Sequence, residues 1–400
     1  MELDLRSNGE IPVEYCKYMS SIEHITIQEY NDYTTKIIDL NSLEGMGWFN
    51  RISCRNTHLS SILDNFFKIK LLQHILLSDN LIKVVKVDSE AMHTVVKRVI
   101  NSMGHNIRVV MIGGKKYRFL NVTNLLKSIF KLSNLFIWPK LLIGKVKPVG
   151  EIIFLDTFLF IDSFSANNEY HDRYYPGIEK SDFDIQKLWY SPTLIGINSP
   201  RSFYSIFKSI RASSTQFLMK EDWLKISDYF SAIYLSFRLT RKINKIPLWR
   251  GLNIEELVKD EIRKDIFSMD MINPILIYLF VRRLQLSGVK MKLAIDWHEN
   301  QVIDRALILG IRNFYPKTKI HGYQGYVVPD YYACKDPISI EYENKTLPHK
   351  IFVIGEKFIE SKKKYCTNLP VFIAPAFRFS AIHSVNNNAK NPLNKILLLL

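Results

Sequence analysis

The segment from Lys292 to Gly325 restricts the fold of this chain more than any other part of the sequence. Lys292–Asp296 is short and apolar, as expected of a strand buried in a parallel sheet. From Asn300 to Phe314 the apolar residues recur at helical spacing, and Pro316 ends that helix. Lys319–Tyr323 has the pattern of a second strand. The segment therefore predicts a strand–helix–strand unit, which is typical of α/β proteins.

The rest of the chain also alternates between short apolar runs and helical patterns. Ile62–Leu77 has helical periodicity. The further expected strands are Lys83–Val87, Ile107–Ile112, Glu151–Leu155, Thr193–Ile197, Thr215–Met219, Lys350–Ile354, Val371–Ala374 and Lys395–Leu400. This alternation predicts an α/β fold with a Rossmann-like, mostly parallel sheet.

The same pattern divides the chain into three parts. Residues 1–80 are an N-terminal segment of uncertain fold, and residues 81–383 form the Rossmann-like domain. Residues 384–400 contain a polar, Asn-rich linker followed by the apolar run Lys395–Leu400. This run is typical of the opening strand of a second Rossmann-like domain. Because an unpaired apolar strand favours aggregation, we expect that this second domain is truncated; the alternative is that the strand docks on the existing sheet.

The net charge favours a partner that carries phosphate groups. A formal charge of +15 attracts nucleic acids, nucleotide-activated substrates and anionic membrane surfaces. The basic residues are dispersed, however, and the densest run, Lys362–Lys364, is too short for a nucleic-acid-binding arm. Zinc-finger spacings and RNA-binding aromatic signatures are absent from the sequence, so no nucleic-acid partner is expected.

Cysteine spacing and the N-terminal sequence favour a cytoplasmic location. Cys16, Cys54, Cys334 and Cys366 lie far apart and form no CxxC pair, so neither a zinc site nor a redox dithiol is expected. The first residues, MELDLRSNGE, are polar and acidic, unlike a secretory signal. Isolated thiols without such a signal are typical of cytoplasmic proteins.

One segment has the composition of a membrane-surface helix. The sequence has no apolar run of the roughly 18 residues that a spanning helix needs. Leu125–Lys147 carries five lysines among Leu, Ile, Phe and Trp residues. Such a segment can lie at the inner face of the plasma membrane, or it can pack on the core with its lysines directed outward.

Several catalytic motifs are absent or incomplete. No GxGxxG follows a strand, and Gly113-Gly114-Lys115 lacks the spacing of a phosphate-binding loop. His298-Glu299 lacks the second histidine of HExxH, and no GxSxG is present. Asp182-Phe183-Asp184 matches the DxD pattern of some glycosyltransferases, but the match is short and a solvated loop explains it better. A bound metal or a dinucleotide cofactor is therefore not expected.

The predicted strand ends bring together a set of candidate catalytic residues. Ligands of open α/β sheets bind outside the carboxyl ends of the strands, where Glu299, His298 and His321 are expected. Glu299 can act as a general base toward a hydroxyl group, or it can stabilise the start of the following helix. Either histidine can accept the proton or hold a leaving phosphate, or can be hydrogen-bonded in place.

Other residues near these ends are candidates for substrate binding. Asn300 lies just past the end of the first strand, and Tyr323 and Gln324 lie at the end of the second. The amide groups of Asn300 and Gln324 can bond sugar hydroxyls, although as turn residues they need no such role. Arg378 can bind a phosphate or carboxylate through two parallel hydrogen bonds, or can form a surface ion pair. Asp162 belongs to a loop of interleaved polar and aromatic residues that suits an acceptor sugar, although an ordinary surface loop is an equal alternative.

The last third of the sequence resembles a known family. The W-x-E-N motif ending at Asn300, the Gly322–Gly325 turn and the later IFVIGE and APAFRF blocks resemble bacterial surface-polysaccharide glycosyltransferases of O-antigen and capsule synthesis. The similarity covers mainly residues 285–400 and includes relatives of Kdo and sialic-acid transferases. It matches Glu299, Tyr323, Gln324 and Arg378 to family positions. Gly325 stands where relatives often carry His.

The resemblance implies a function as well as a fold. It implies the N-terminal half of a two-domain GT-B protein, whose second domain normally binds most of the donor. It also implies transfer of a sugar from a nucleotide-activated donor, with CMP-linked sugars favoured, to a lipid-linked or saccharide acceptor, without a metal cofactor. The alternative is a non-catalytic or truncated pathway component that binds saccharide without transfer. Another α/β enzyme acting on phosphorylated substrates would need a phosphate loop that the sequence lacks.

Overall fold

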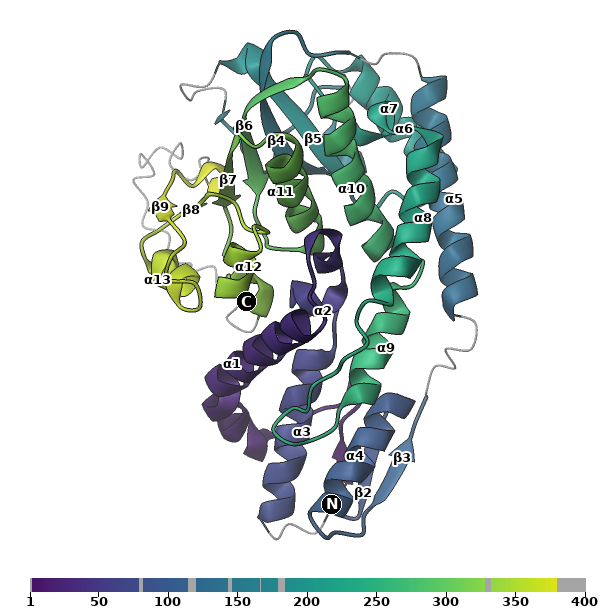
Figure 1. Cartoon of the computed structure of the whole chain (residues 1–400), viewed down its shortest axis with the longest axis vertical. Coiled ribbons are helices and arrows are strands. Elements are labelled where there is room, and N and C mark those ends of the chain that lie inside the picture. Colours follow the sequence, from purple (N-terminus) through teal and green to yellow (C-terminus); the bar gives the residue numbers. More distant parts are fainter. Residues whose placement is uncertain are drawn as a thin grey trace, which may run out of the picture.

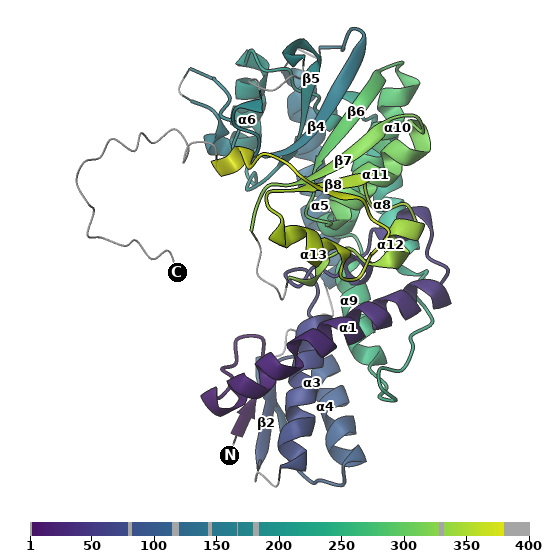
Figure 2. The same ribbon diagram turned by 90° about the vertical axis from the view of Figure 1, so that its left-hand side faces the viewer.

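The protein contains two separate parallel sheets joined by long helices. The computed structural model describes residues 2–78, 82–113, 120–142, 146–165, 167–178, 184–327 and 332–379. Figure 1 shows the larger sheet at one end of the long axis and the smaller sheet at the other, with the helices α1 (Cys16–Leu40) and α9 (Glu255–Asp265) between them. The larger sheet faces the viewer in Figure 2.

The small sheet unites the beginning of the chain with the strands that follow residue 80. Its strands β1 (Glu2–Asp4), β2 (Val84–Val87) and β3 (Arg108–Met111) are parallel and lie in the order β1-β2-β3. The helices α3 (Ile62–Leu77) and α4 (Glu90–Ser102) pack beside them. The first 80 residues therefore contribute a strand and a helix to the same unit as β2 and β3.

The large sheet has six parallel strands with one change of direction in their order. The order is β5-β4-β6-β7-β8-β9. The strands are β4 (Glu151–Leu159), β5 (Leu188–Leu194), β6 (Lys290–Trp297), β7 (Lys319–Gln324), β8 (Lys350–Val353) and β9 (Val371–Ile373). From β4 the chain moves outward to β5, and it then returns to the other side of β4 to build β6 to β9. The boundary between β4 and β6 is therefore the topological switch point, where α/β proteins place their ligands.

Alternation along each strand separates two hydrophobic faces. Phe154 of β4 and Ala294 of β6 pack under the helices α10 (Met269–Leu286) and α11 (Val302–Phe314). Leu155 and Ile295, one position further along, pack on the opposite face with an aromatic cluster. The register pairs Phe154 with Ala294 and Leu155 with Ile295, so equivalent positions of β4 and β6 share a face.

The remaining helices surround the large sheet and connect it to the small one. They are α2 (Arg51–Cys54), α5 (Leu120–Leu141), α6 (Pro200–Ala212), α7 (Lys220–Trp223), α8 (Ile226–Thr240), α12 (Ser339–Glu343) and α13 (Lys357–Lys363). Short 3-10 turns lie at Val13–Tyr15, Gly45–Trp48, Ile161–Ser163, Ile185–Lys187, Ala333–Lys335 and Phe377–Phe379. Among the described residues, no helix is both long enough and apolar enough to cross a membrane.

Most of the predicted elements are confirmed, and two are corrected. The α/β fold with parallel sheets, the helix over Ile62–Leu77 and the strand–helix–strand unit at β6, α11 and β7 are all present. The strand expected at Thr193–Ile197 begins earlier, because β5 uses the apolar run that starts at Leu188. The strand expected at Thr215–Met219 is wrong: only Phe217 forms an isolated bridge, to Tyr190.

Three predictions fall outside the described residues. They are the DxD pattern at Asp182 and Phe183, the linker Ser384–Asn394 and the strand Lys395–Leu400.

Candidate functional site

A tight turn links β6 to α11 at the switch point. Asn300 adopts a positive φ of 56°, a conformation that asparagine tolerates better than most residues. The carboxylate of Asp304, in the first turn of α11, accepts the backbone N–H groups of Glu299 and Gln301 at 2.9 Å each. Asp304 therefore satisfies the free N–H groups that precede the helix.

Glu299 occupies the turn between the strand and the helix. Its carboxylate accepts a hydrogen bond from the indole Nε1 of Trp297 at 3.0 Å and another from the side-chain amide of Gln301. Burial raises the pKa of Glu299, and these two hydrogen bonds, His298 and Arg378 oppose that rise. A half-buried carboxylate with a raised pKa is suited to accept a proton from a bound hydroxyl.

Beneath this turn lies a group of three aspartates and one histidine that we call the carboxyl cluster: Asp156, Asp296, Asp304 and His298. Asp156 of β4 and Asp296 of β6 face each other across the switch point, because the pair Leu155 and Ile295 precedes them in register. One potential ligand atom from each of Asp296, His298 and Asp304 lies within 4.8 Å of the other two. All three of these side chains are buried.

Within the carboxyl cluster, few hydrogen bonds or opposite charges offset the cost of burying the carboxyl groups. His298 Nδ1 lies 2.8 Å from Asp296 Oδ2, and burial lowers the pKa of His298 to about 4. Burial, together with Glu299, raises the pKa of Asp296 to about 8. Burial, and then the neighbouring Asp296, hold the pKa values of Asp156 and Asp304 well above their ordinary range. Asp296 Oδ1, His298 Nε2 and Asp304 Oδ1 are buried without a hydrogen-bond partner.

A second buried group of charges, which we call the Arg–Glu cluster, lies beside the same turn. It comprises Arg55, Arg305, Glu341 and Asn300. The carboxylate of Glu341 accepts hydrogen bonds from Arg55 at 2.9 Å, Arg305 at 2.5 Å and Asn300 at 3.0 Å. Both guanidinium groups also donate to backbone carbonyls, among them those of Ala333 and Ser53. These contacts fix the end of α2, the start of α11 and α12 relative to one another.

A hollow opens next to the turn at the carboxyl end of β5. Its lining includes Lys131 of α5, Lys220 of α7, Asn273 of α10 and Gln301. Burial and the positive charge of Lys220 lower the pKa of Lys131. Gln301 both lines this hollow and donates a hydrogen bond to Glu299, so it connects the hollow with the turn.

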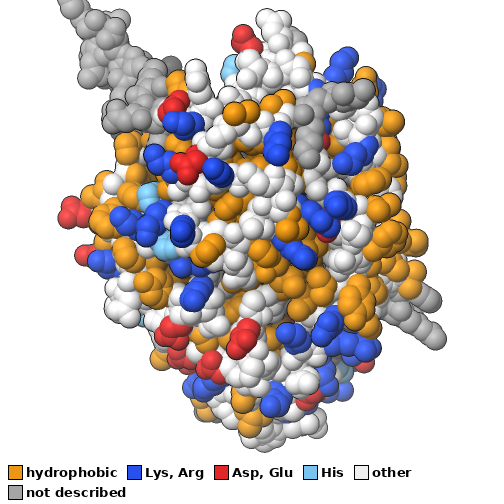
Figure 3. Space-filling view, turned by 45° about the horizontal axis from the view of Figure 1, so that its top comes forward, with side chains coloured by type: hydrophobic (Ala, Val, Ile, Leu, Met, Phe, Trp, Pro, Cys, Tyr) orange, Lys and Arg blue, Asp and Glu red, His pale blue; other side chains and the backbone are white. Residues whose placement is uncertain are grey.

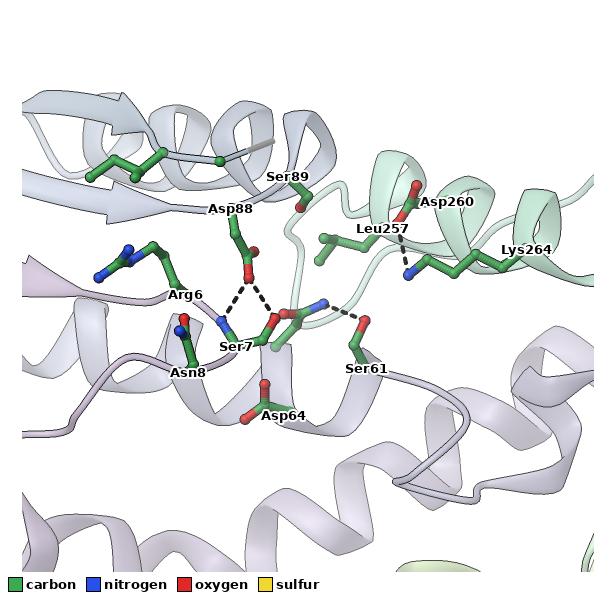
Figure 4. A pocket seen from close by; sticks show the side chains of 13 residues that line it. Arg6, Ser7, Asn8, Ser61, Asp64, Asp88, Ser89, Leu257, Asp260 and Lys264 are labelled. Atoms are coloured by element: carbon green, nitrogen blue, oxygen red, sulfur yellow. Dashed lines mark hydrogen bonds and ion pairs between the residues drawn. The ribbon is translucent and has the colours of Figure 1, made fainter. Parts of the chain in front are cut away.

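Another hollow, shown in Figure 4, lies at the carboxyl edge of the small sheet. Glu299 follows β6 of the large sheet, at the other end of the long axis in Figure 1. Its acidic groups are already engaged. Asp88 accepts hydrogen bonds from the backbone and side chain of Ser7, and Asp260 pairs with Lys264 at 3.0 Å. The hollow at β5 and the turn at Glu299 therefore remain the better candidate for catalysis.

The structure gives several predicted site residues a structural partner. Asn300 is fully buried and donates to Cys334 and Glu341. Gln324 is buried and donates to the hydroxyl of Tyr326 at 3.3 Å. The hydroxyl of Tyr323 donates to the carbonyl of Pro375 at 2.9 Å and accepts the N–H of Phe377.

The other predicted residues are dispersed around the sheet. Glu299 and His298 lie together at the end of β6. His321 lies within β7, where its ring contacts Phe352, and burial lowers its pKa. Arg378 is exposed in the turn after β9 and contributes to the electrostatic field at Glu299. Asp162 is exposed and pairs with Arg173 at 2.8 Å.

The sequence argument did not identify the residues that surround the turn. Asp296 interrupts an apolar strand, and Asp304 and Arg305 lie in the first turn of α11. An acidic residue within an apolar strand is a signal that sequence reasoning could have used. Glu341 gave no such signal, because it lies in an ordinary polar segment.

Comparison of the chain with protein-family models, with curated proteins and with solved structures gave no match.

Proposed function

We propose that this protein is a glycosyltransferase of the GT-B type that transfers a sugar from a nucleotide-activated donor in surface-polysaccharide synthesis. The observation that supports the proposal best is the environment of Glu299. Its carboxylate is half-buried at the switch point, is held by Trp297 and Gln301, and has a raised pKa. The resemblance to O-antigen and capsule glycosyltransferases favours this chemistry over other uses of a buried carboxylate.

In the proposed reaction Glu299 is the general base. An acceptor hydroxyl must lose its proton as it attacks the anomeric carbon of the donor, and Glu299 accepts that proton. The leaving group carries phosphate, so positive charge nearby stabilises the transition state. Among the described residues, Arg378 and Lys131 of the β5 hollow are cations at this edge, whereas Lys220 of the same hollow pairs with Glu221 at 3.0 Å. By resemblance, the donor is a CMP-linked sugar of the Kdo or sialic-acid class.

The direct test is the Glu299→Gln substitution. The amide keeps the shape of the side chain but cannot accept a proton, so turnover should fall by about 10²–10⁴-fold. Glu90→Gln is the matched control, because Glu90 is an exposed carboxylate in the first turn of a helix that follows a strand. Retained transfer by the Glu299→Gln protein would exclude Glu299 as the base.

Nucleotide binding provides a second test and names the donor class. Thermal shift with CMP, UDP and GDP should reveal stabilisation by one nucleotide, because a ligand that binds the folded state raises its stability. Binding of a saccharide acceptor without any nucleotide would instead favour the alternative function, a pathway component that binds saccharide without transfer.

We also propose that the protein attaches to an anionic membrane through α5 and α8, where a lipid-linked acceptor would be found. The two helices touch through Phe136 and Tyr229, whose ring centroids are 5.7 Å apart. Their exposed apolar side chains recur at helical spacing: Val122, Leu126, Ile129, Phe130, Ile137 and Leu141 on α5, and Ile226, Phe230 and Tyr234 on α8. The α5 residues belong to one helix face, while Leu132 and Leu135 of the same helix point to the core.

The charges on these helices favour an anionic surface as the partner. α5 contains no Asp or Glu residue, and the one acidic residue of α8, Asp228, is buried and pairs with Arg283 at 2.8 Å. The exposed charges, including Lys127 and Lys140 on α5 and Arg238 on α8, are positive. Figure 3 shows mainly basic side chains among the hydrophobic ones on the right-hand side of the molecule. Apolar and basic groups on one face are the composition of a helix that lies on a membrane.

Vesicle co-sedimentation tests this attachment. The protein should bind vesicles of phosphatidylcholine mixed with phosphatidylglycerol more strongly than vesicles of phosphatidylcholine alone. The double substitution Phe130→Glu and Phe230→Glu should weaken binding, whereas Leu77→Glu, at an exposed position of α3, should not. Equal binding of the two variants would show that this face does not contact the lipid.

A further inference from the structure

The carboxyl cluster gathers three carboxyl groups in one place. In the described parts of the chain, no lysine or arginine forms an ion pair with Asp156, Asp296 or Asp304. Lys220 lines the same small hollow as Asp156 and Asp304, but its Nζ pairs with Glu221 at 3.0 Å. Buried carboxylates without a countercharge are strongly unfavourable, so such a group needs either bound protons or a bound cation.

The geometry of the cluster suits a bound ion. Ligand atoms from Asp296, His298 and Asp304 lie within 4.8 Å of one another. Atoms that bind one transition-metal ion at about 2.0–2.2 Å lie up to about 4 Å apart, so small side-chain movements would close the group around an ion. Each of the three residues also has a buried polar atom without a partner: Asp296 Oδ1, His298 Nε2 and Asp304 Oδ1.

We propose that Asp296, His298 and Asp304 bind one divalent transition-metal ion, with Asp156 as the neighbouring fourth group. Imidazole combined with carboxylates is a ligand set used by ions such as Mn²⁺ and Zn²⁺. His298 Nδ1 and Asp296 Oδ2 lie 2.8 Å apart, a separation that two neighbouring ligand atoms of one ion can have. Asp156 and Asp304 line the same small cavity of about 20 Å³.

The ion has a positioning role in this arrangement. Asp296 belongs to β6, Asp304 belongs to α11, and Asp304 also accepts the backbone N–H of Glu299 at 2.9 Å. An ion shared by the strand and the helix ties the two elements together directly below Glu299. This site does not depend on the chemistry proposed for Glu299, because a chain that binds saccharide without transfer would hold the ion equally well.

The experiment compares metal content and thermal stability in the full chain. Protein purified without a histidine tag is treated with EDTA, and Mn²⁺ or Zn²⁺ is then added while bound metal and melting temperature are measured. We expect about one equivalent of metal and a rise in melting temperature. Asp296→Asn and Asp304→Asn should weaken binding at least about ten-fold, since even partners of metal ligands contribute that much. Glu299→Gln is the matched control and should retain the metal.

The outcomes separate this site from its alternatives. If the folded wild-type protein shows neither bound metal nor a melting shift with millimolar Mn²⁺ or Zn²⁺, the cluster holds protons and the proposal is wrong. Equal metal binding by wild-type, Asp296→Asn and Asp304→Asn proteins would place the ion elsewhere. If either variant does not fold, the wild-type titration and the milder substitution His298→Gln decide the question. Loss of transfer with retained metal in Glu299→Gln separates this site from the proposed base.

Discussion

Two groups of buried charges lie next to the Glu299 turn, and they are built in opposite ways. In the Arg–Glu cluster, two guanidinium groups surround one carboxylate, and nearby carbonyls take the remaining N–H groups. In the carboxyl cluster, three carboxyls and a histidine face one another, and three polar atoms lack partners. Arg305 and Asp304 are adjacent in sequence, so one turn of α11 contributes to both.

The difference separates a structural role from a binding role. A buried ion group with every donor and acceptor satisfied holds segments of the chain in one arrangement. The Arg–Glu cluster does this between α2, α11 and α12, which come from distant parts of the sequence. A buried group with unmatched charge stabilises nothing by itself and instead indicates a ligand. Substitutions in the two clusters should therefore have effects of opposite sign.

The largest effect is expected in the Arg–Glu cluster. Glu341→Gln removes the carboxylate that pairs with both Arg55 and Arg305, and both arginines then remain buried without this countercharge. The free energy of unfolding should fall by about 3–5 kcal/mol, measured by urea denaturation. Glu343→Gln, at an exposed position of the same helix, should change it by less than about 0.5 kcal/mol. A loss below about 1 kcal/mol at Glu341 would contradict the structural role.

A smaller effect of opposite sign is expected in the carboxyl cluster. With metal removed by chelation, Asp296→Asn removes a carboxyl whose ionised form is disfavoured by burial and then by Glu299, so it should raise the free energy of unfolding by about 1–2 kcal/mol at neutral pH. With saturating Mn²⁺, the wild-type protein should become the more stable of the two, because the variant lacks a ligand. A variant that is less stable than wild type in both conditions would mean that Asp296 has a purely structural role.

The smallest effect is expected for an ion pair that is open to solvent. Arg98 of α4 and Glu256 of α9 form two contacts, at 2.8 and 3.0 Å, and both side chains are about one-third exposed. A double-mutant cycle with Arg98→Gln and Glu256→Gln should give a coupling below about 1 kcal/mol, reduced further by salt.

The pH dependence of this coupling follows from the lowered pKa of Glu256. The hydrogen bond from Arg98 lowers the pKa of Glu256 below its usual 4.5. The coupling should therefore be complete above about pH 4.5 and disappear as the pH falls through the lowered pKa of the folded state. A coupling that persists when Glu256 is protonated would show that the contact is not ionic.

The sequence by itself determined the elements that depend on local pattern. The helix at Ile62–Leu77 and the unit formed by β6, α11 and β7 were predicted because apolar residues recur at the period of a helix or a strand. The position of Glu299 just after β6 was also predictable, since it follows directly from the strand and helix boundaries. The shifted bounds of β5 and the incorrect strand at Thr215–Met219 show the limit of this periodicity. An apolar run does not by itself determine which residues pair in a sheet.

Only the tertiary structure decided which distant residues meet. The pairing of β4 with β6 brings Asp156 against Asp296, and Arg55 reaches Glu341 across 286 residues of sequence. The tertiary structure also showed that the side chains of Asn300, Tyr323 and Gln324 form hydrogen bonds within the protein. The physical reason is that periodicity records whether a residue is buried, whereas the partner of a buried charge depends on the order of the strands and on the packing of helices from distant segments.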